Sequence, residues 1–319
     1  MKIVILERHS VGTDVSIDIL NELGEVTVYN NTVTQEEVRQ RVAGMDVVIA
    51  NKSPLNESTL SEALDLKLIC ELATGFDNVD TEYCQKRGIA VSNVVDYSTD
   101  SVVQHTFAML FYVLEKLRHY DDYVKGGEYA SQSRFSNFDL PFTELSGKTW
   151  GIIGMGHIGQ KVASVAKAFG CRVIFHSVTG KSKVTDYEQV SFDELLSSSD
   201  VLSLHCPLSD ITRGIINREA LLKMKETAIL INVARGPVVV DADLAEALEK
   251  GIIAGAGLDV TGTEPMKAEN PLSRITDSNK LIITPHLAWA SIEARNRCVK
   301  ETFENIKAFS EGKRRNVVV

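Results

Sequence analysis

The sequence predicts an α/β fold with two doubly wound parallel sheets, one in each of two domains. Short apolar runs alternate with longer polar stretches of helical pattern, which is the rhythm of βαβ units and parallel sheets. This rhythm fills the N-terminal third, stops at a long apolar helical stretch and then starts again. With 319 residues the chain is also longer than one ordinary core requires, so two domains are expected.

The first domain is expected to be discontinuous and to comprise residues 1–99 and 290–319. Its N-terminal part holds five apolar runs, enough for a small flavodoxin-like sheet. Residues 291–312 read as one amphipathic helix, which we expect to return to this domain. The expected strands are Ile3–Leu6, Val26–Tyr29, Val47–Ala50, Leu68–Leu72 and Ile89–Ser92.

The second domain is expected at residues 100–289. It opens with a long apolar helix that Thr99 or Asp100 caps and that runs through about Arg118, and an aromatic loop follows at residues 129–142. Six later apolar runs fit a complete doubly wound sheet of the Rossmann type. Its expected strands are Thr149–Ile153, Arg172–Phe175, Val201–Leu204, Ile229–Val233, Gly255–Val260 and Leu281–Thr284.

A glycine-rich turn joins the first of these six strands to a helix expected over Gln160–Phe169. Glycine lets the backbone turn sharply and approach a pyrophosphate, while the new helix directs unpaired N–H groups and its positive dipole end at the anion. Because GxGxxG stands here between a strand and a helix, we expect a nicotinamide dinucleotide to bind at this turn. The residues expected to line it are Gly154, Gly156, His157, Ile158 and Gly159.

Bulk composition narrows the function classes. The net charge of −9 argues against nucleic acid or an anionic membrane as the main partner, because either needs a basic face. The five cysteines are scattered without CxxC spacing, so neither a disulfide framework nor a metal site is expected. No apolar run approaches the ~20 residues of a membrane helix. We therefore expect a cytoplasmic protein that binds a small molecule and no metal.

Three polar side chains follow successive strands of the second domain. Arg235 follows AILINV, Glu264 follows GAGLDV, and His286 follows KLIITP. Ligands of open parallel sheets bind outside the carboxyl ends of the strands, so these side chains are expected to converge beside the dinucleotide. Each also has an ordinary reading, as a surface cation, a solvated loop acid and a turn histidine beside a proline.

An arginine, a glutamate and a histidine are the groups that reduction of a 2-oxo acid requires. Hydride transfer to C2 builds negative charge on the carbonyl oxygen, which calls for a proton donor and a fixed cation. His286 can give the proton, and Arg235 can hold the substrate carboxylate. Glu264, bonded to the other ring nitrogen, would orient the histidine and favour its charged form.

Six sequence runs together resemble the D-isomer-specific 2-hydroxyacid dehydrogenases over essentially the whole chain. Within that family, the segment Phe135–Asp139 followed by ELSGKT, together with ATGFDNVD and TPHLAWAS, is most similar to the glycerate dehydrogenase (hydroxypyruvate reductase) branch. The six runs are ATGFDNVD, NVVDYSTDSVVQHTFAML, ELSGKTWGIIGMGHIGQ, INVARGPVVVD, GLDVTGTEP and TPHLAW.

The resemblance implies roles for further residues. A turn after a first-domain strand would offer backbone N–H groups to the substrate carboxylate, and Asp259 would lie near the nicotinamide end of the cofactor. The segment after the strand at residues 201–204 would line the adenosine side. The substrate contacts implied are Ala73, Thr74, Gly75, Arg235 and His286. The remaining cofactor contacts expected are His176, Ser177, Cys206, Pro207, Thr212, Val233 and Ala234.

One position departs from the family pattern. NAD-preferring members carry an aspartate at the end of the second Rossmann strand, where it accepts from the ribose 2′-hydroxyl. Ser177 stands there instead, 18 residues beyond Gly159, with Lys181 and Lys183 close downstream. A carboxylate would repel the extra phosphate of NADP, whereas serine can donate to it and lysine can neutralise it. We expect NADP(H) to be preferred, with use of NAD(H) as the alternative if the lysines form only a solvated turn.

The expected activity is reduction of a small 2-oxo acid by NAD(P)H to a D-2-hydroxy acid, with hydroxypyruvate and glyoxylate as leading substrates. One alternative keeps the mechanism and changes the pocket, giving a D-lactate or aromatic 2-oxo acid dehydrogenase. Another is a dinucleotide-sensing binding protein of the corepressor type. His105, on the apolar helix, is interpreted as a core histidine. The same helix and the aromatic loop are expected to form a homodimer face.

Overall fold

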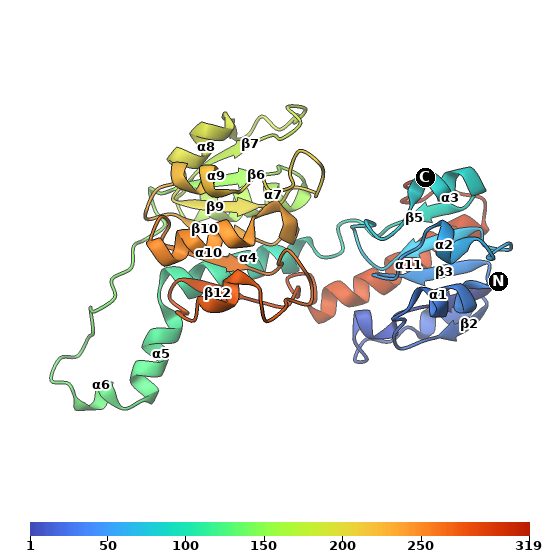
Figure 1. Ribbon diagram of the computed structural model, residues 1–319, viewed down its shortest axis with the longest axis horizontal. Coiled ribbons are helices and arrows are strands. Elements are labelled where there is room, and N and C mark those ends of the chain that lie inside the picture. Colours follow the sequence, from blue (N-terminus) through green and yellow to red (C-terminus); the bar gives the residue numbers. More distant parts are fainter. The chain divides into compact units, whose positions relative to one another are not determined.

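The computed structural model describes residues 1–319, and the chain forms two compact units. The first unit comprises Met1–Ser98 and Trp289–Val319, and the second comprises Thr99–Ala288. Each unit is a parallel sheet with helices packed against it (Figure 1). The prediction of an α/β fold with two doubly wound parallel sheets is confirmed.

The first unit contains a five-stranded parallel sheet with β2 (Glu25–Val28), β1 (Lys2–Ile5), β3 (Val47–Ala50), β4 (Leu68–Glu71) and β5 (Ala90–Ser92) in that spatial order. This is the flavodoxin-like order, in which the chain changes direction across the sheet between β1 and β3. Strands β3 and β4 are buried at every residue, as central strands of a parallel sheet are. The apolar residues Val47–Ala50 and Leu68–Cys70 therefore made both strands predictable from the sequence.

Helices cover both faces of the first sheet (Figure 1). Helix α11 (Ile292–Ser310) begins after Ser291, whose hydroxyl accepts from the Ala294 amide, and it buries Phe303 and Ile306 against the sheet. One face packs against α1 (Gln35–Val42), α2 (Glu57–Leu60) and α3 (Thr81–Arg87). The other packs against α11 (Ile292–Ser310) and the 3-10 segments η1 (Arg8–Val11) and η2 (Asp18–Leu23).

The C-terminal segment adds an antiparallel partner to the edge strand β5. The Val91 amide donates to Val319 O over 3.2 Å, and the Val318 amide donates to Val91 O over 2.7 Å. A bridge between Ser92 and Val317 continues this pairing. The β5 edge, which would otherwise expose unpaired backbone groups, is thereby covered.

The second unit contains a seven-stranded parallel sheet, one strand more than the six expected. The additional strand has only two residues, both polar and exposed, so no apolar run announced it. The spatial order is that of a Rossmann fold. In that order the strands are β12 (Leu281–Ile283), β11 (Gly255–Leu258), β10 (Ile229–Asn232), β9 (Val201–Leu204), β6 (Thr149–Ile153), β7 (Arg172–His176) and the additional β8 (Glu188–Gln189).

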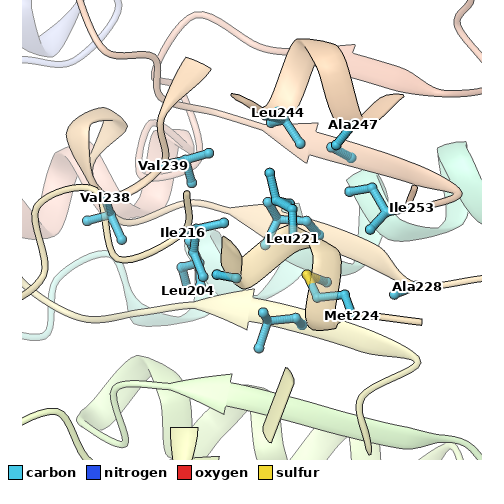
Figure 2. Packing of buried hydrophobic residues seen from close by; sticks show 14 of the residues in the cluster. Leu204, Ile216, Leu221, Met224, Ala228, Val238, Val239, Leu244, Ala247 and Ile253 are labelled. Atoms are coloured by element: carbon cyan, nitrogen blue, oxygen red, sulfur yellow. The ribbon is translucent and has the colours of Figure 1, made fainter. Parts of the chain in front are cut away.

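Two hydrophobic clusters fill the two faces of the second sheet. Figure 2 shows part of one of them, where Leu221 and Met224 belong to the same buried cluster as Leu244 and Ala247. That face is covered by α8 (Phe192–Ser198), α9 (Arg218–Lys223), α10 (Asp241–Lys250) and the 3-10 turns η3 (Gly236–Val238) and η4 (Pro271–Arg274). The opposite face is covered by α4 (Thr99–Leu114) and α7 (His157–Ala168).

The single helix expected to run through about Arg118 is wrong in one respect. Helix α4 ends at Leu114, and Lys116 takes a left-handed backbone angle, φ 56°, before α5 (Leu117–Lys125) begins. The Lys116 ammonium donates to Asn279 O over 3.0 Å, which ties the break to the turn before β12. A short helix, α6 (Glu128–Ser131), then leads into the aromatic loop.

Three global features bear on the functional classes. All five cysteines are buried and unpaired. No cluster of three or more histidine, cysteine, aspartate or glutamate side chains is arranged to hold a metal ion. None of the helices combines the length and the apolar character needed to cross a membrane.

Candidate active site

His286 and Glu264 are in direct contact at the carboxyl edge of the second sheet. Glu264 lies in the loop after β11 and His286 in the loop after β12, and His286 Nδ1 is 2.7 Å from Glu264 Oε2. A carboxylate accepts only, so Nδ1 carries the proton of this hydrogen bond. In the neutral ring, the other nitrogen, Nε2, is then the one without a proton. The two side chains are 27% and 34% exposed, so the pair is accessible to a small molecule.

The backbone holds the histidine in an uncommon conformation. His286 has φ 53°, in the left-handed region that non-glycine residues rarely adopt. Its amide donates to Asp259 O over 2.8 Å and to Thr284 O over 3.0 Å. Conformations of this kind persist only where the surroundings over-determine them, and they cluster at functional sites.

Arg235 lies on a neighbouring loop, after β10. The Asn232 side chain shapes this loop, because its amide donates to Arg235 O and its oxygen accepts from the Ala234 amide, both over 3.0 Å. The next residue must be glycine, since a Cβ on Gly236 would lie 1.7 Å from Thr261 O in the loop that carries Glu264. The loops after β10 and β11 therefore touch. Val233 and Ala234, expected to contact cofactor, lie in the first of them.

Asp259 ties the end of β11 to the loop of His286. Its side chain is 1% exposed and accepts from the amides of Leu287 and Ala288, each over 2.8 Å. It also accepts from the Thr284 hydroxyl over 2.6 Å. A buried carboxylate with this many donors is well satisfied and rigid.

The three glycines of the GxGxxG turn are required for two different reasons. A Cβ on Gly154 would lie 2.6 Å from the Cys206 nitrogen, and one on Gly159 would lie 2.1 Å from Gly154 O, so the fold itself excludes side chains there. At Gly156, by contrast, nothing lies within 4 Å of the Cβ position. That space adjoins the start of α7, where no side chain caps the helix. The turn thus fits a pyrophosphate, which would accept from the first-turn amides.

The other cofactor residues expected from sequence lie around this turn or at the next strand ends. His157 is exposed and Ile158 is half-buried in the first turn of α7. Cys206 and Pro207 follow β9, and the Thr212 hydroxyl donates to Pro207 O over 2.7 Å. Burial raises the pKa of the Cys206 thiol to about 11, so it stays protonated. Its backbone, next to Gly154, forms the wall of the turn.

The end of β7 carries no acid. His176 closes the strand, and its Nδ1 lies 3.1 Å from Val190 O. The Ser177 hydroxyl accepts from the Ser182 amide over 3.3 Å and so closes a turn. The lysines at 181 and 183 in this segment are exposed.

The substrate turn expected at Ala73-Thr74-Gly75 belongs to the first unit. It follows β4, and three hydrogen bonds fasten it to the chain after β5. The Thr74 hydroxyl donates to Val94 O over 2.8 Å, the Asn93 amide group donates to Thr74 O over 2.7 Å, and the Val94 amide donates to Ala73 O over 2.9 Å. The turn is thus rigid within its own unit.

Sequence reasoning missed Asn232 and Thr284. Both are polar residues at the carboxyl ends of apolar strands, which was the signal already used for the charged residues that follow. They were overlooked because each falls at a predicted strand's last positions, where a polar residue reads as ordinary termination.

A Rossmann sheet with a fitted dinucleotide turn, and a histidine–glutamate pair at its carboxyl edge, define a NAD(P)-dependent oxidoreductase. Residues 107–288 match the family model described as D-isomer specific 2-hydroxyacid dehydrogenase, NAD binding domain. The chain belongs to the D-isomer-specific 2-hydroxyacid dehydrogenase family, as its sequence runs indicated.

Two relatives resemble the chain over all or nearly all of its length. It is 39% identical to a hydroxypyruvate reductase of Blautia hydrogenotrophica, over 100% of this chain and 99% of that protein. It is 38% identical to a glycerate dehydrogenase of Methylorubrum extorquens, over 99% and 98%. A similar solved structure is an acyclic imino acid reductase (Bsp5) in complex with NADPH and D-Arg, with TM-score 0.90 and 32% identity over 100% of both chains.

Proposed function

We propose that this protein reduces hydroxypyruvate or glyoxylate to the corresponding D-2-hydroxy acid with a nicotinamide cofactor. The observation that carries the proposal is the hydrogen bond between His286 and Glu264, on a loop in contact with that of Arg235. This set supplies the proton donor and the cation that a 2-oxo acid requires. The names of two relatives, a hydroxypyruvate reductase and a glycerate dehydrogenase, support the choice of substrate.

Each residue has one proposed role. The Arg235 guanidinium binds the substrate carboxylate and polarises the C2 carbonyl. His286 Nε2 gives a proton to the C2 oxygen as the carbonyl is reduced, and Glu264 stabilises the charged ring before that transfer. The cofactor, when bound, supplies the hydride. We also assign the first unit, through Ala73-Thr74-Gly75, to substrate binding and the second unit to cofactor binding.

The direct test monitors the oxidation of NADPH and of NADH by absorbance. The substrates are hydroxypyruvate, glyoxylate, pyruvate and phenylpyruvate. Turnover of the first two supports the proposal. Activity confined to pyruvate or phenylpyruvate would instead indicate a D-lactate or aromatic 2-oxo acid dehydrogenase. Arg235→Ala and His286→Ala should lose turnover while keeping cofactor binding. Cofactor binding by the unaltered protein without turnover of any 2-oxo acid would indicate a dinucleotide sensor.

We propose a preference for NADP(H) over NAD(H). Ser177 stands at the position where a ribose-binding acid would repel the 2′-phosphate, and the exposed Lys181 and Lys183 lie close downstream. Ser177→Asp should therefore raise kcat/KM for NADH relative to NADPH, while Ser182→Asp, in the same turn, controls for added charge. Equal or better use of NADH by the unaltered protein would reject the preference.

We also propose a homodimer, as expected from the sequence, but formed through α5 and the aromatic loop. The apolar side of α4, the helix expected to take part, is instead buried against the second sheet. Helix α5 buries none of its residues, and Phe135 and Phe138 are 90% and 72% exposed. Such an apolar surface is unusual on a monomer. Light scattering should give twice the chain mass, and Phe135→Asp with Phe138→Asp should reduce it to the monomer. A monomeric unaltered protein would reject this assembly.

The proposed compartment is the cytoplasm. Its support is the state of the thiols, since the five cysteines are unpaired as reducing conditions would leave them. Cell fractionation with an antibody to the chain tests this assignment.

A further inference from the structure

His105 makes its polar contact at the carboxyl end of β12, next to the loop that carries His286. It lies on α4, and its Nε2 is 2.9 Å from Thr284 Oγ1 and 3.6 Å from Asp259 Oδ1. Its side chain is 18% exposed, so its ring is largely withdrawn from water. Helix α4 crosses β11 and β12, and the ring thereby reaches the carboxyl ends of both strands. The interpretation of His105 as a core residue is therefore incomplete.

The direction of the hydrogen bonds follows from counting protons. Thr284 Oγ1 lies 2.6 Å from Asp259 Oδ1, and because a carboxylate accepts only, the single hydroxyl proton is used in that bond. The hydroxyl oxygen can then only accept from His105. The proton of the neutral imidazole must therefore be on Nε2. The result is a one-way relay from His105 through Thr284 to Asp259.

The relay ends on the loop that carries the proposed acid. Asp259 holds this loop by three bonds of 2.8 Å, through its carbonyl to the His286 amide and through its carboxylate to the amides of Leu287 and Ala288. A rotation of the Asp259 carboxylate would loosen two of these bonds together. The Thr284 hydroxyl, which accepts from His105, is the one side-chain donor to that carboxylate and helps to fix its orientation.

We propose that His105 is a positioning residue, which acts through Thr284 and Asp259 to hold the loop of His286 in the geometry for proton transfer. The catalytic part of this proposal rests on the proposed 2-oxo acid reduction, whereas the relay itself does not. Burial lowers the pKa of His105, with Asp259 opposing. A neutral ring donates one hydrogen bond to Thr284 and places no positive charge beside Asp259.

Kinetics of relay variants test the positioning role. His105→Leu and Thr284→Val should each lower kcat by about tenfold to a hundredfold, since small misplacements cost that much. The Kd for NADPH should change by less than about threefold. Because both variants interrupt the same hydrogen-bond relay, the kcat of the double variant should be no lower than that of the slower single variant. His105→Gln, which keeps a donor near Nε2, should restore most of the rate.

The matched control is Thr106→Val, which removes a buried hydroxyl from the next position of the same helix. It lies outside the relay and should leave kcat unchanged. Additive losses in the double variant, or equal losses in the control and in His105→Leu, would overturn the positioning role.

Nitrogen-15 NMR of the imidazole rings tests the relay without any turnover. The chain has seven histidines, and the His105→Gln spectrum identifies the signal of His105. An Nε2–H tautomer at pH 7.5 is expected, and an Nδ1–H tautomer or a doubly protonated ring would overturn the relay. If the unaltered protein turns over no 2-oxo acid but shows the Nε2–H tautomer, the proposed function fails and the relay stands.

Discussion

The Glu71 carboxyl should make the first unit less stable as the pH rises. Glu71 is the last residue of β4 and is 0% exposed. The only hydrogen bond to its carboxyl group comes from the Asn78 side-chain amide, 3.1 Å from Oε1. Burial raises the pKa of Glu71 from 4.5 to about 8, and the nearby Glu7 adds to the rise. The folded form therefore holds a proton that the unfolded form gives up between these two values.

The sign and size of the effect follow from linkage. Below about pH 4.5 both forms are protonated and there is no cost, whereas above about pH 8 the full cost applies. At about 1.4 kcal/mol per pKa unit the full cost is about 5 kcal/mol. Glu71→Gln keeps the size and the bond from Asn78 without the charge. It should match the unaltered protein near pH 4.5 and exceed its stability by up to that amount above pH 8.

Amide hydrogen exchange, read by mass spectrometry on peptides from β3 and β4, measures this difference within the first unit. Comparison at equal pH cancels the intrinsic exchange rates, and peptides from β9 and β10 serve as the internal reference. Glu62→Gln removes one charge from an exposed position and controls for net charge. If protection in Glu71→Gln and in the unaltered protein changes in parallel from pH 4.5 to 9, the reasoning is refuted.

Three further predictions concern single features. Gly156→Ala should fold normally and weaken NADPH binding, because the new methyl group enters the open space at the turn. Gly159→Ala should lower the melting temperature, because its methyl group would lie 2.1 Å from Gly154 O. Equal melting temperatures of the two variants would contradict this. Cys206 should resist iodoacetamide at pH 7.5 in the native protein and react in urea, since burial raises its pKa to about 11; mass spectrometry of the labelled peptide decides. Deletion of residues 317–319 should reduce hydrogen-exchange protection around β5 by about 1–3 kcal/mol, the net worth of two lost backbone bonds, and unchanged protection would show that the pairing contributes nothing.

The sheets could be predicted because central parallel strands are apolar on both faces. Val47–Ala50, Thr149–Ile153 and Val201–Leu204 were predicted with the bounds the structure has. The edge strand β8 escaped, since two exposed polar residues have no apolar pattern to detect. The break at Lys116 escaped as well, because a left-handed lysine leaves no signal in composition.

The contact between His286 and Glu264 was expected from one topological rule, that residues after neighbouring parallel strands meet at one edge. The contact between His105 and Thr284 had no such rule behind it. It depends on which face of α4 lies over β12, and the crossing of a helix over a sheet is set by side-chain packing that a periodic pattern does not encode.

Because the first unit is discontinuous, synthesis from the N-terminus imposes an order on the folding of the two units. The ribosome makes residues 99–288, a contiguous unit, before it makes α11. Until α11 emerges, the sheet face of the nascent chain that it will cover, with Ile3, Ile49 and Leu68, lacks its largest apolar partner. The second unit can therefore fold during translation, while the first must wait with an exposed apolar face, which is the state that chaperones recognise.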